Sequence, residues 1–177
     1  MKLLTFIVLI LIAPILAGFF GAMLDQGTYT ISPEFFRANR FDNIPFSWTV
    51  NERLMAGIAG WNQSWKFGVV LGVALSAIGT IHNGHMKMFY YTLWSFFLAL
   101  GVTAVVSLIG MVVTLNTVFE IPVNMSVDIE QPAKYMAVIM INNYARSGGI
   151  IGVLLGVGYQ ILQTKKDGLE DEDEDES

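Results

Sequence analysis

The chain has 177 residues, of which 54% are hydrophobic and 14% are charged, and its apolar residues gather in long runs. This composition excludes an ordinary soluble domain and indicates an integral membrane protein. The absence of cysteine excludes disulfide and thiol chemistry, and the net charge of -5 comes from segment 167–177, which holds eight of the fifteen acids and no base. We expect no nucleic-acid partner, and we expect this segment to be a disordered cytoplasmic tail.

The first apolar run, residues 3–24, is long enough to cross the hydrocarbon core as a helix. A cleaved signal peptide is the alternative, because Lys2 and the apolar residues after it are typical of such a leader. The small residues that a cleavage site requires are missing, since Ile15 lies two positions before Ala17. We therefore expect an uncleaved first span.

The next segment, "TYTISPEFF" at residues 28–36, differs from everything around it. Its first four residues favour a short strand, and Ser32, Pro33 and Glu34 are typical of a helix start. The natural partner strand is "VFEIPVNMSVDI" in the second outer loop. We predict a small extracytoplasmic cap with short strands that ties two hairpins together. The alternative is a binding or catalytic role for Tyr29 and Glu34.

A second helix is predicted over residues 50–82, because Thr49 and Glu52 have the spacing of a capping box. Such a helix would be about 50 Å long, which is more than one bilayer requires. We expect its first part to lie at the outer interface, with Trp61 among its anchors, and its second part to span the membrane.

Two further apolar runs complete the predicted fold, an all-α membrane protein with four transmembrane helices in two hairpins. One membrane domain, residues 1–166, has its spans at about 3–24, 64–82, 88–115 and 144–163, and its outer loops at 25–63 and 116–143. Positive charges flank the spans in short segments at Lys2, Lys87, Lys165 and Lys166. The positive-inside rule then places both termini in the cytoplasm, and the expected location is the cell inner membrane.

The second and fourth predicted spans share a pattern, since "NQSWKFGVVLG" from Asn62 matches "NNYARSGGIIG" from Asn142 at a separation of 80 residues. A repeated hairpin explains the match, and chance agreement is the alternative. Small residues spaced by four allow helices to approach closely, so we expect the second and fourth helices to be the closest pair; self-association into an oligomer is the competing interpretation. The glycines expected at such contacts are Gly68, Gly72, Gly148, Gly152 and Gly156.

The repeat also contains the candidate polar site. Asn62 and Lys66, like Asn142 and Arg146, lie four residues apart and share a helix face near the outer boundary. Together they would suit an anion or a lipid head group on the outer face. Snorkelling and interfacial hydrogen bonding are the simpler explanation of the same residues.

The sequence contains no recognisable catalytic, metal or cofactor motif. The turn "HNGHMKM" at residues 82–88 offers two histidines and two methionines to a soft metal, but without a distant ligand it is better explained as an Asn-Gly turn. Apart from Lys66 and Arg146 near the outer boundary, the predicted spans hold no charged residue, which argues against a pump or coupled transporter. We expect no enzyme activity, no metal and no cofactor.

The stretch "DQGTYTISPEFF", residues 25–36, together with "NNYARSGGIIG", resembles a family of small, uncharacterised bacterial membrane proteins. That family carries the segment DQxTYTISPE(Y/F)F after its first span, and the resemblance covers most of the membrane body but not the acidic tail. It implies a four-helix membrane fold without a known activity, and it makes Tyr29, Ser32, Pro33 and Glu34 signature residues. Family members have a histidine where this chain has Asn142, so no metal or proton role is carried over to that position.

Two functions remain open at this point. The first is a non-enzymatic structural or accessory membrane protein that acts through membrane lipid, a protein partner or a second copy of itself. The alternative is a small channel or passive transporter lined by the Gly/Ser/Thr stripes.

Overall fold

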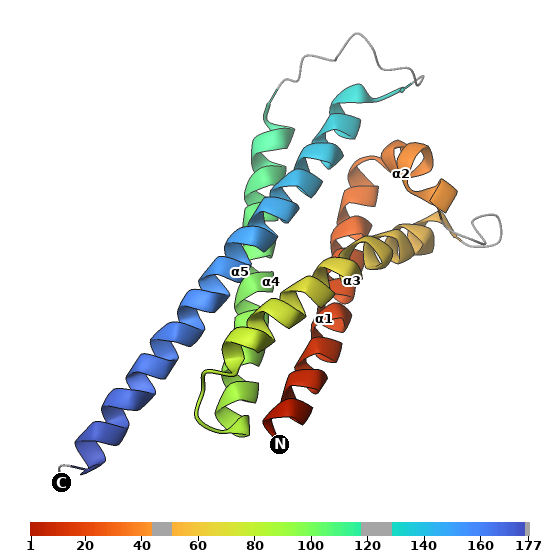
Figure 1. Ribbon diagram of the computed structural model, residues 1–177. Coiled ribbons are helices and arrows are strands. Elements are labelled where there is room, and N and C mark those ends of the chain that lie inside the picture. The colour runs from red at the N-terminus through yellow and green to blue at the C-terminus, as the bar shows by residue number, and fades with distance from the viewer. Residues whose placement is uncertain (44–50, 118–128, 176–177) are drawn as a thin grey trace.

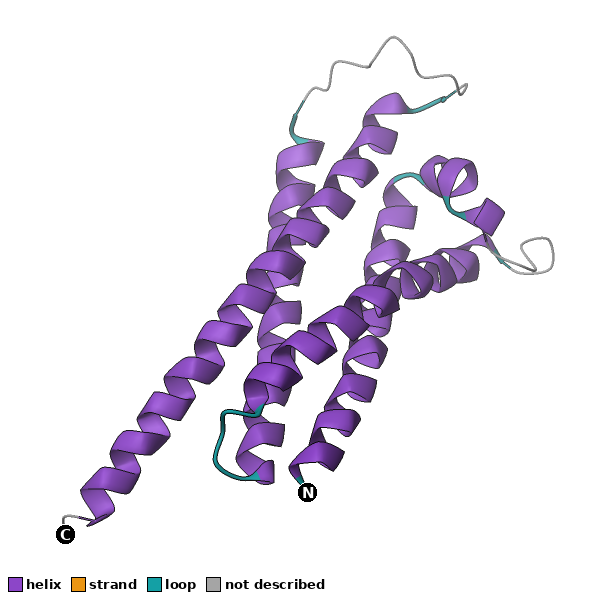
Figure 2. Ribbon diagram, in the orientation of Figure 1, coloured by secondary structure: helices purple, strands orange, loops and turns teal. Residues whose placement is uncertain are grey.

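The computed structural model describes residues 1–43, 51–117 and 129–175 of the chain. These residues form helices and connecting turns, without a strand among them (Figure 2). The elements are α1 (Lys2–Ile31), α2 (Pro33–Asn39), the 3-10 turn η1 (Phe41–Asn43), α3 (Glu52–Gly79), α4 (His85–Leu115) and α5 (Pro132–Asp175). The prediction of short strands is therefore wrong for the described residues.

The four long helices form two antiparallel pairs, α1 with α3 and α4 with α5 (Figure 1). The pairs meet at one end of the molecule and diverge toward the other. Both chain termini and the α3–α4 turn lie where the pairs meet, which we call the terminal end. The short helix α2 lies at the opposite end, which we call the cap end.

Among the residues that the structure describes, three helices are long and apolar enough to cross a membrane: α1, α4 and residues Pro132–Leu169 of α5. They indicate that the protein is associated with a membrane. The prediction of four apolar spans is wrong, because α3 does not reach the same apolarity. Its first half contains Glu52, Arg53 and most of a polar stretch at residues 62–66. Helix α3 instead packs antiparallel along α1.

Small residues allow close packing within each pair. A Cβ atom added at Gly68 would lie 2.6 Å from Pro14 Cα of α1, and one at Gly152 would lie 2.6 Å from the Ala99 carbonyl oxygen of α4. Each glycine stripe thus packs mainly on the helix of its own pair, so the prediction that the second and fourth helices form the closest pair is wrong. A Cβ atom would come within 3.3 Å of another helix at all five predicted contact positions, Gly68, Gly72, Gly148, Gly152 and Gly156.

At the terminal end the two pairs are joined by buried apolar side chains, here called the bundle cluster. Its members are Leu9, Ala13, Leu71, Leu75, Met88, Phe96 and Ala99. Gln160 of α5 adds a polar link, since its Nε2 donates to the Leu75 carbonyl at 3.0 Å and its Oε1 accepts from Thr92 Oγ1 at 3.5 Å. The side chain is fully buried, so these bonds satisfy a group that would otherwise be costly to bury.

The segment predicted as a strand, residues 28–31, is the last turn of α1. Thr28 Oγ1 donates to the Leu24 carbonyl at 3.2 Å, and the Ser32 amide donates to the Thr28 carbonyl at 3.1 Å. Packing of the Tyr29 ring at 5.6 Å from Phe36 outweighs the weak strand preference of these residues. The proposed partner strand falls largely on residues 118–128, outside the described part of the chain.

The helix start predicted after it is confirmed. Ser32 is the N-cap of α2, its Oγ accepts from the Phe35 amide at 3.3 Å, and Pro33 occupies the first helical position. The carboxylate of Glu34 accepts from the backbone amides of Glu130 and Gln131, at 2.7 and 3.3 Å, just before α5 begins. This signature segment therefore connects the first pair to the start of α5.

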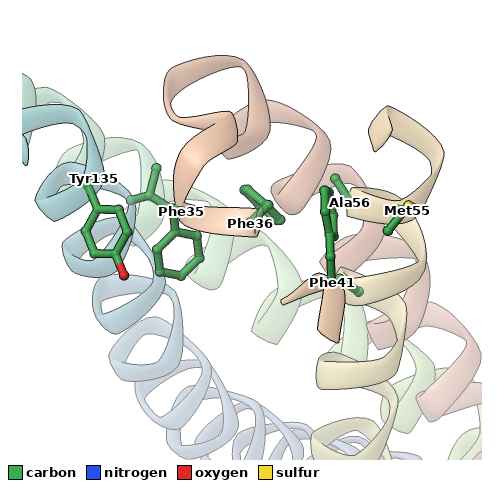
Figure 3. Packing of buried hydrophobic residues seen from close by; sticks show 8 residues of the cluster. Phe35, Phe36, Phe41, Met55, Ala56 and Tyr135 are labelled. Carbon is green, nitrogen blue, oxygen red and sulfur yellow. The ribbon is translucent and has the colours of Figure 1, made fainter. Parts of the chain in front are cut away.

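An aromatic cluster, here called the cap cluster, holds α2 between α3 and α5 (Figure 3). The Phe35 ring packs edge-on against Tyr135 of α5 at 5.4 Å, whereas Phe41 lies toward α3. Its buried members are Phe35, Phe36, Phe41, Met55, Ala56, Ala59, Tyr135 and Val138. The cap ties the two pairs together through a short helix and aromatic rings instead of paired strands.

The start of α3 differs from the predicted capping box. Its N-cap is Asn51, whose Oδ1 accepts from the Arg53 amide at 2.8 Å, and Thr49 lies outside the described residues. The Glu52 carboxylate turns toward the cap instead, where it accepts from Arg37 Nη2 at 2.8 Å and from Tyr29 Oη at 2.7 Å. Glu52 thus fixes the cap to α3.

We expect the cap contact of Glu52 to make the stability of the protein depend on acid pH. The hydrogen bonds from Arg37 and then from Tyr29 lower the pKa of Glu52 below its ordinary value of 4.5. A lowered folded-state pKa gives stability that is present above pH 4.5 and is lost as the pH falls through the folded-state pKa. Because the pair is exposed, the gain is about 0.2–1 kcal/mol. Melting temperature measured against pH should therefore be flatter for Glu52→Gln.

The matched control is Glu130→Gln, because Glu130 is an exposed acid whose backbone amide makes the cap contact. Its acid profile should follow that of the wild type. Equal pH profiles for the wild type and Glu52→Gln would contradict the assigned role of Glu52.

Helix α5 ends at Asp175, so it includes most of the segment predicted as a disordered tail. Near the start of this segment, Asp167 pairs with Lys87 Nζ at 3.1 Å and accepts from Tyr91 Oη at 3.1 Å. These contacts attach the C-terminal part of α5 to α4 at the terminal end.

Candidate functional site

A cavity of about 440 Å³ lies between the two helix pairs. We call it the inter-pair cavity. All four long helices contribute to its wall, which includes Leu71 of the bundle cluster. Its polar lining consists of Asp25, Gln63, Ser64, Thr103, Asn142 and Arg146, and its apolar lining includes Phe20, Leu24, Phe67, Leu100 and Ile150.

Asp25 is the most unusual residue of this lining, because a carboxylate on an apolar helix is only 2% exposed. Its Oδ2 lies 3.7 Å from Arg40 Nη1, too far for a hydrogen bond, and it has no hydrogen-bond partner among the described residues. Burying a charge this way costs free energy unless the group is paired and hydrogen-bonded. Such a residue inside a membrane helix marks a functional site by default.

Arg40, at the C-terminal end of α2, supplies the opposite charge. Its side chain is 15% exposed, and its Nη2 donates to Asn142 Oδ1 of α5 at 3.4 Å. Burial lowers the pKa of Arg40, the nearby Asp25 carboxylate counteracts this, and the charge of Arg146 lowers the pKa further. The three charged groups therefore act on one another around the cap end of the cavity.

Only half of the predicted polar site lies in this cavity. Asn142 and the exposed Arg146 line it, whereas Asn62 and Lys66, which are also exposed, do not. On α3 the lining residues are Gly60, Gln63, Ser64, Phe67 and Leu71. Successive residues turn by 100° around a helix, so Asn62 lies on the side away from Gly60 and Ser64. The sequence repeat therefore does not place its polar residues on equivalent faces.

Sequence reasoning missed Asp25 and Arg40 because it assigned both to an outer loop. A signal for Asp25 was present, since Ala17, Gly21 and Asp25 recur every four residues along one helix face. The structure extends α1 to Ile31, which brings Asp25 into an apolar helix and corrects the prediction that the first span holds no charged residue. No comparable signal points to Arg40, because its contacts cross from α2 to α1 and α5.

The other candidate residues make local contacts. Tyr29, Ser32, Pro33 and Glu34 hold the cap together as described above. His82 in the α3–α4 turn is buried, and its Nδ1 lies 3.1 Å from Thr164 Oγ1; this burial lowers the pKa of His82. Within the described residues, no group of three or more His, Asp or Glu side chains could hold a metal ion.

Fold and site together define a class: a helical, membrane-associated protein with two helix pairs, a helical cap and a buried ion pair beside a mostly apolar cavity with a few polar groups. Comparison with protein-family models, with curated proteins and with solved structures gives no match for this chain. The resemblance carried by "DQGTYTISPEFF" therefore remains a prediction.

Proposed function

We propose that this chain is a non-enzymatic, multi-pass protein of a bacterial inner membrane that acts by binding a lipid in the inter-pair cavity. The observation that carries the proposal is the cavity itself, in which a few charged and amide side chains converge on a space with apolar walls. Ligand sites commonly have this composition. The cavity volume of about 440 Å³ suits a head group with the beginning of its chains.

The walls of the cavity favour a lipid over a water-soluble ligand. Phe67 and Ile150 line it, and their side chains are 42% and 59% exposed. On a membrane-embedded bundle such side chains face acyl chains. A lipid could therefore place its head group beside Arg146 while its chains stay in contact with the bilayer.

The same proposal includes an orientation with both termini in the cytoplasm. It is supported by the position of both termini at one end of the molecule (Figure 1). Four lysines also flank the helices in short segments, namely Lys2, Lys87, Lys165 and Lys166. The diverging cap end, with the inter-pair cavity nearer to it, would then lie toward the opposite membrane surface.

A channel is less well supported than lipid binding. The glycines of the proposed pore stripes meet atoms of neighbouring helices, and the bundle cluster fills the space between the pairs at the terminal end. A continuous polar path would have to cross that cluster.

The proposal is tested by filling the cavity. Leu100 lies on its α4 wall, so Leu100→Trp should displace lipid that is retained when the protein is purified in mild detergent. Native mass spectrometry should show several-fold less bound phospholipid in this variant than in the wild type.

The matched control is Leu108→Trp, on the same helix at a position that is 58% exposed and outside the cavity. It should retain lipid at the wild-type level. Equal lipid retention by Leu100→Trp, Leu108→Trp and the wild type would overturn the proposal.

A further inference from the structure

Charged side chains of both signs surround the inter-pair cavity. Asp25 and Arg146 both have hydrogen-bonding capacity that contacts within the protein leave open. Asp25 is only 2% exposed, yet its Oδ2 receives no hydrogen bond from the described residues. Arg146 makes no hydrogen bond or ion pair with another side chain in the part of the chain that the structure describes, and it lines the same cavity. Both groups offer binding capacity to a ligand.

We propose that the lipid bound in this cavity has a head group with both a primary ammonium and a phosphate, the ammonium seated on Asp25 and the phosphate on Arg146. This inference rests on the proposed lipid-binding function and specifies its ligand class. Asp25, Asn142 and Arg146 all line this cavity. Arg40 lies 3.7 Å from the Asp25 carboxylate and 3.4 Å from Asn142 Oδ1, so Asp25 and Asn142 lie near each other, and Arg146 follows Asn142 by one turn of α5.

The ammonium assignment follows from what Asp25 lacks. An ionised carboxylate accepts several hydrogen bonds, and a primary ammonium carries three donors in a small volume. Arg40 neutralises part of the charge from 3.7 Å but gives Oδ2 no hydrogen bond. A trimethylated ammonium could supply charge but no donor, so the site should distinguish the two head groups.

The phosphate assignment follows from the Arg146 guanidinium in the cavity lining. A guanidinium matches the geometry of phosphate oxygens and can bind them with two parallel hydrogen bonds. A head group that carries only a negative charge would give Asp25 Oδ2 no ammonium donor, and a purely cationic one would face Arg40 and Arg146. A zwitterion meets both signs, and the Asn142 side chain lies among the lining residues to complete its contacts.

The experiment compares defined ligands on the purified, delipidated full chain in mild detergent. The probes are dioleoylphosphatidylethanolamine, dioleoylphosphatidylcholine and dioleoylphosphatidylglycerol, with glycerophosphoethanolamine as the head group without acyl chains. Binding is followed by native mass spectrometry and by the melting temperature. We expect the ethanolamine lipid to bind about tenfold more tightly than the choline lipid, because charge-assisted hydrogen bonds are lost with the latter.

Two variants assign the roles of the charges. Asp25→Asn should reduce the preference for ethanolamine over choline, whereas Arg146→Gln should weaken all three phospholipids by a similar factor of about ten. Arg53→Gln is the matched control, because Arg53 donates to Thr30 outside the cavity and its loss should leave all affinities unchanged. If Asp25→Asn does not fold, the comparison of lipids on the wild type is decisive by itself.

The outcomes separate this inference from the function on which it rests. Equal affinity of the wild type for the ethanolamine and choline lipids would overturn the ammonium assignment but leave lipid binding intact. If Leu100→Trp retained as much lipid as Leu108→Trp and the wild type, both the ammonium assignment and the lipid-binding function would be overturned. If glycerophosphoethanolamine bound as tightly as the diacyl lipid, the ligand would be a soluble molecule, and the proposal that it is a membrane lipid would be overturned.

Discussion

Replacement of Arg40 by alanine should destabilise the protein by about 3–5 kcal/mol, the range found when one partner of a buried ion pair is removed. The reason is the carboxylate that remains: Asp25 is 2% exposed, and Arg40 is the cation in its ion pair. The change also removes the hydrogen bond from Arg40 to Asn142 and the stacking of its guanidinium 5.6 Å from the Phe35 ring. Thermal or dodecyl-sulfate unfolding in mild detergent measures the loss.

The control replaces both charges by apolar side chains of similar size, in the double variant Asp25→Leu with Arg40→Met. Such replacements of a buried pair are often neutral or stabilising, so the double variant should recover most of the lost stability. A double-mutant cycle that gives no coupling between the two positions would show that Arg40 does not stabilise Asp25.

The long apolar helices were the most predictable part of this fold. Helix α4 ends at Leu115, where the apolar run of the sequence also ends. The length of an apolar run was enough to predict this helix. Helix α3 was misjudged because its second half is apolar while its first half carries Glu52, Arg53 and a polar stretch. Its position depends on glycine contacts with α1, which hydropathy does not report.

Local preference failed where tertiary contacts decided the outcome. Thr28 and Tyr29 favour a strand in isolation, yet the last turn of α1 places the Tyr29 hydroxyl on Glu52 and its ring on Phe36. The N-cap at Ser32 was predictable because a cap depends on a few adjacent residues.

The candidate site was half predictable for a similar reason. Spacing by four placed Asn142 and Arg146 on one face of α5, and that face does line the cavity. Spacing cannot tell which way a face points, so it grouped them with Asn62 and Lys66, which do not line the cavity. The pairing of Asp25 with Arg40 joins α1 to the end of α2, a contact that depends on the cap fold.

Replacement of Gly60 by alanine should separate α1 from α3 and destabilise the protein by about 2 kcal/mol, within the range for an overpacked core. An added Cβ atom would clash with the Gly21 carbonyl oxygen, lie 2.7 Å from its carbon and lie 2.8 Å from Asp25 Cβ. Two of these atoms belong to the backbone, so a rotamer change cannot relieve the clash. Because Gly60 lines the inter-pair cavity, lipid retention should fall along with the unfolding temperature.

Gly158→Ala and Gly101→Ala are the matched controls, because a Cβ atom at either glycine would meet nothing within 4 Å. Alanine favours a helix over glycine by about 0.8–1.0 kcal/mol, so these variants should be as stable as the wild type or slightly more so. The contrast distinguishes a specific close approach of two helices from a general intolerance of larger residues in membrane helices. If all three variants lost stability equally, the close contact of Gly60 with Gly21 would not be what holds α1 and α3 together.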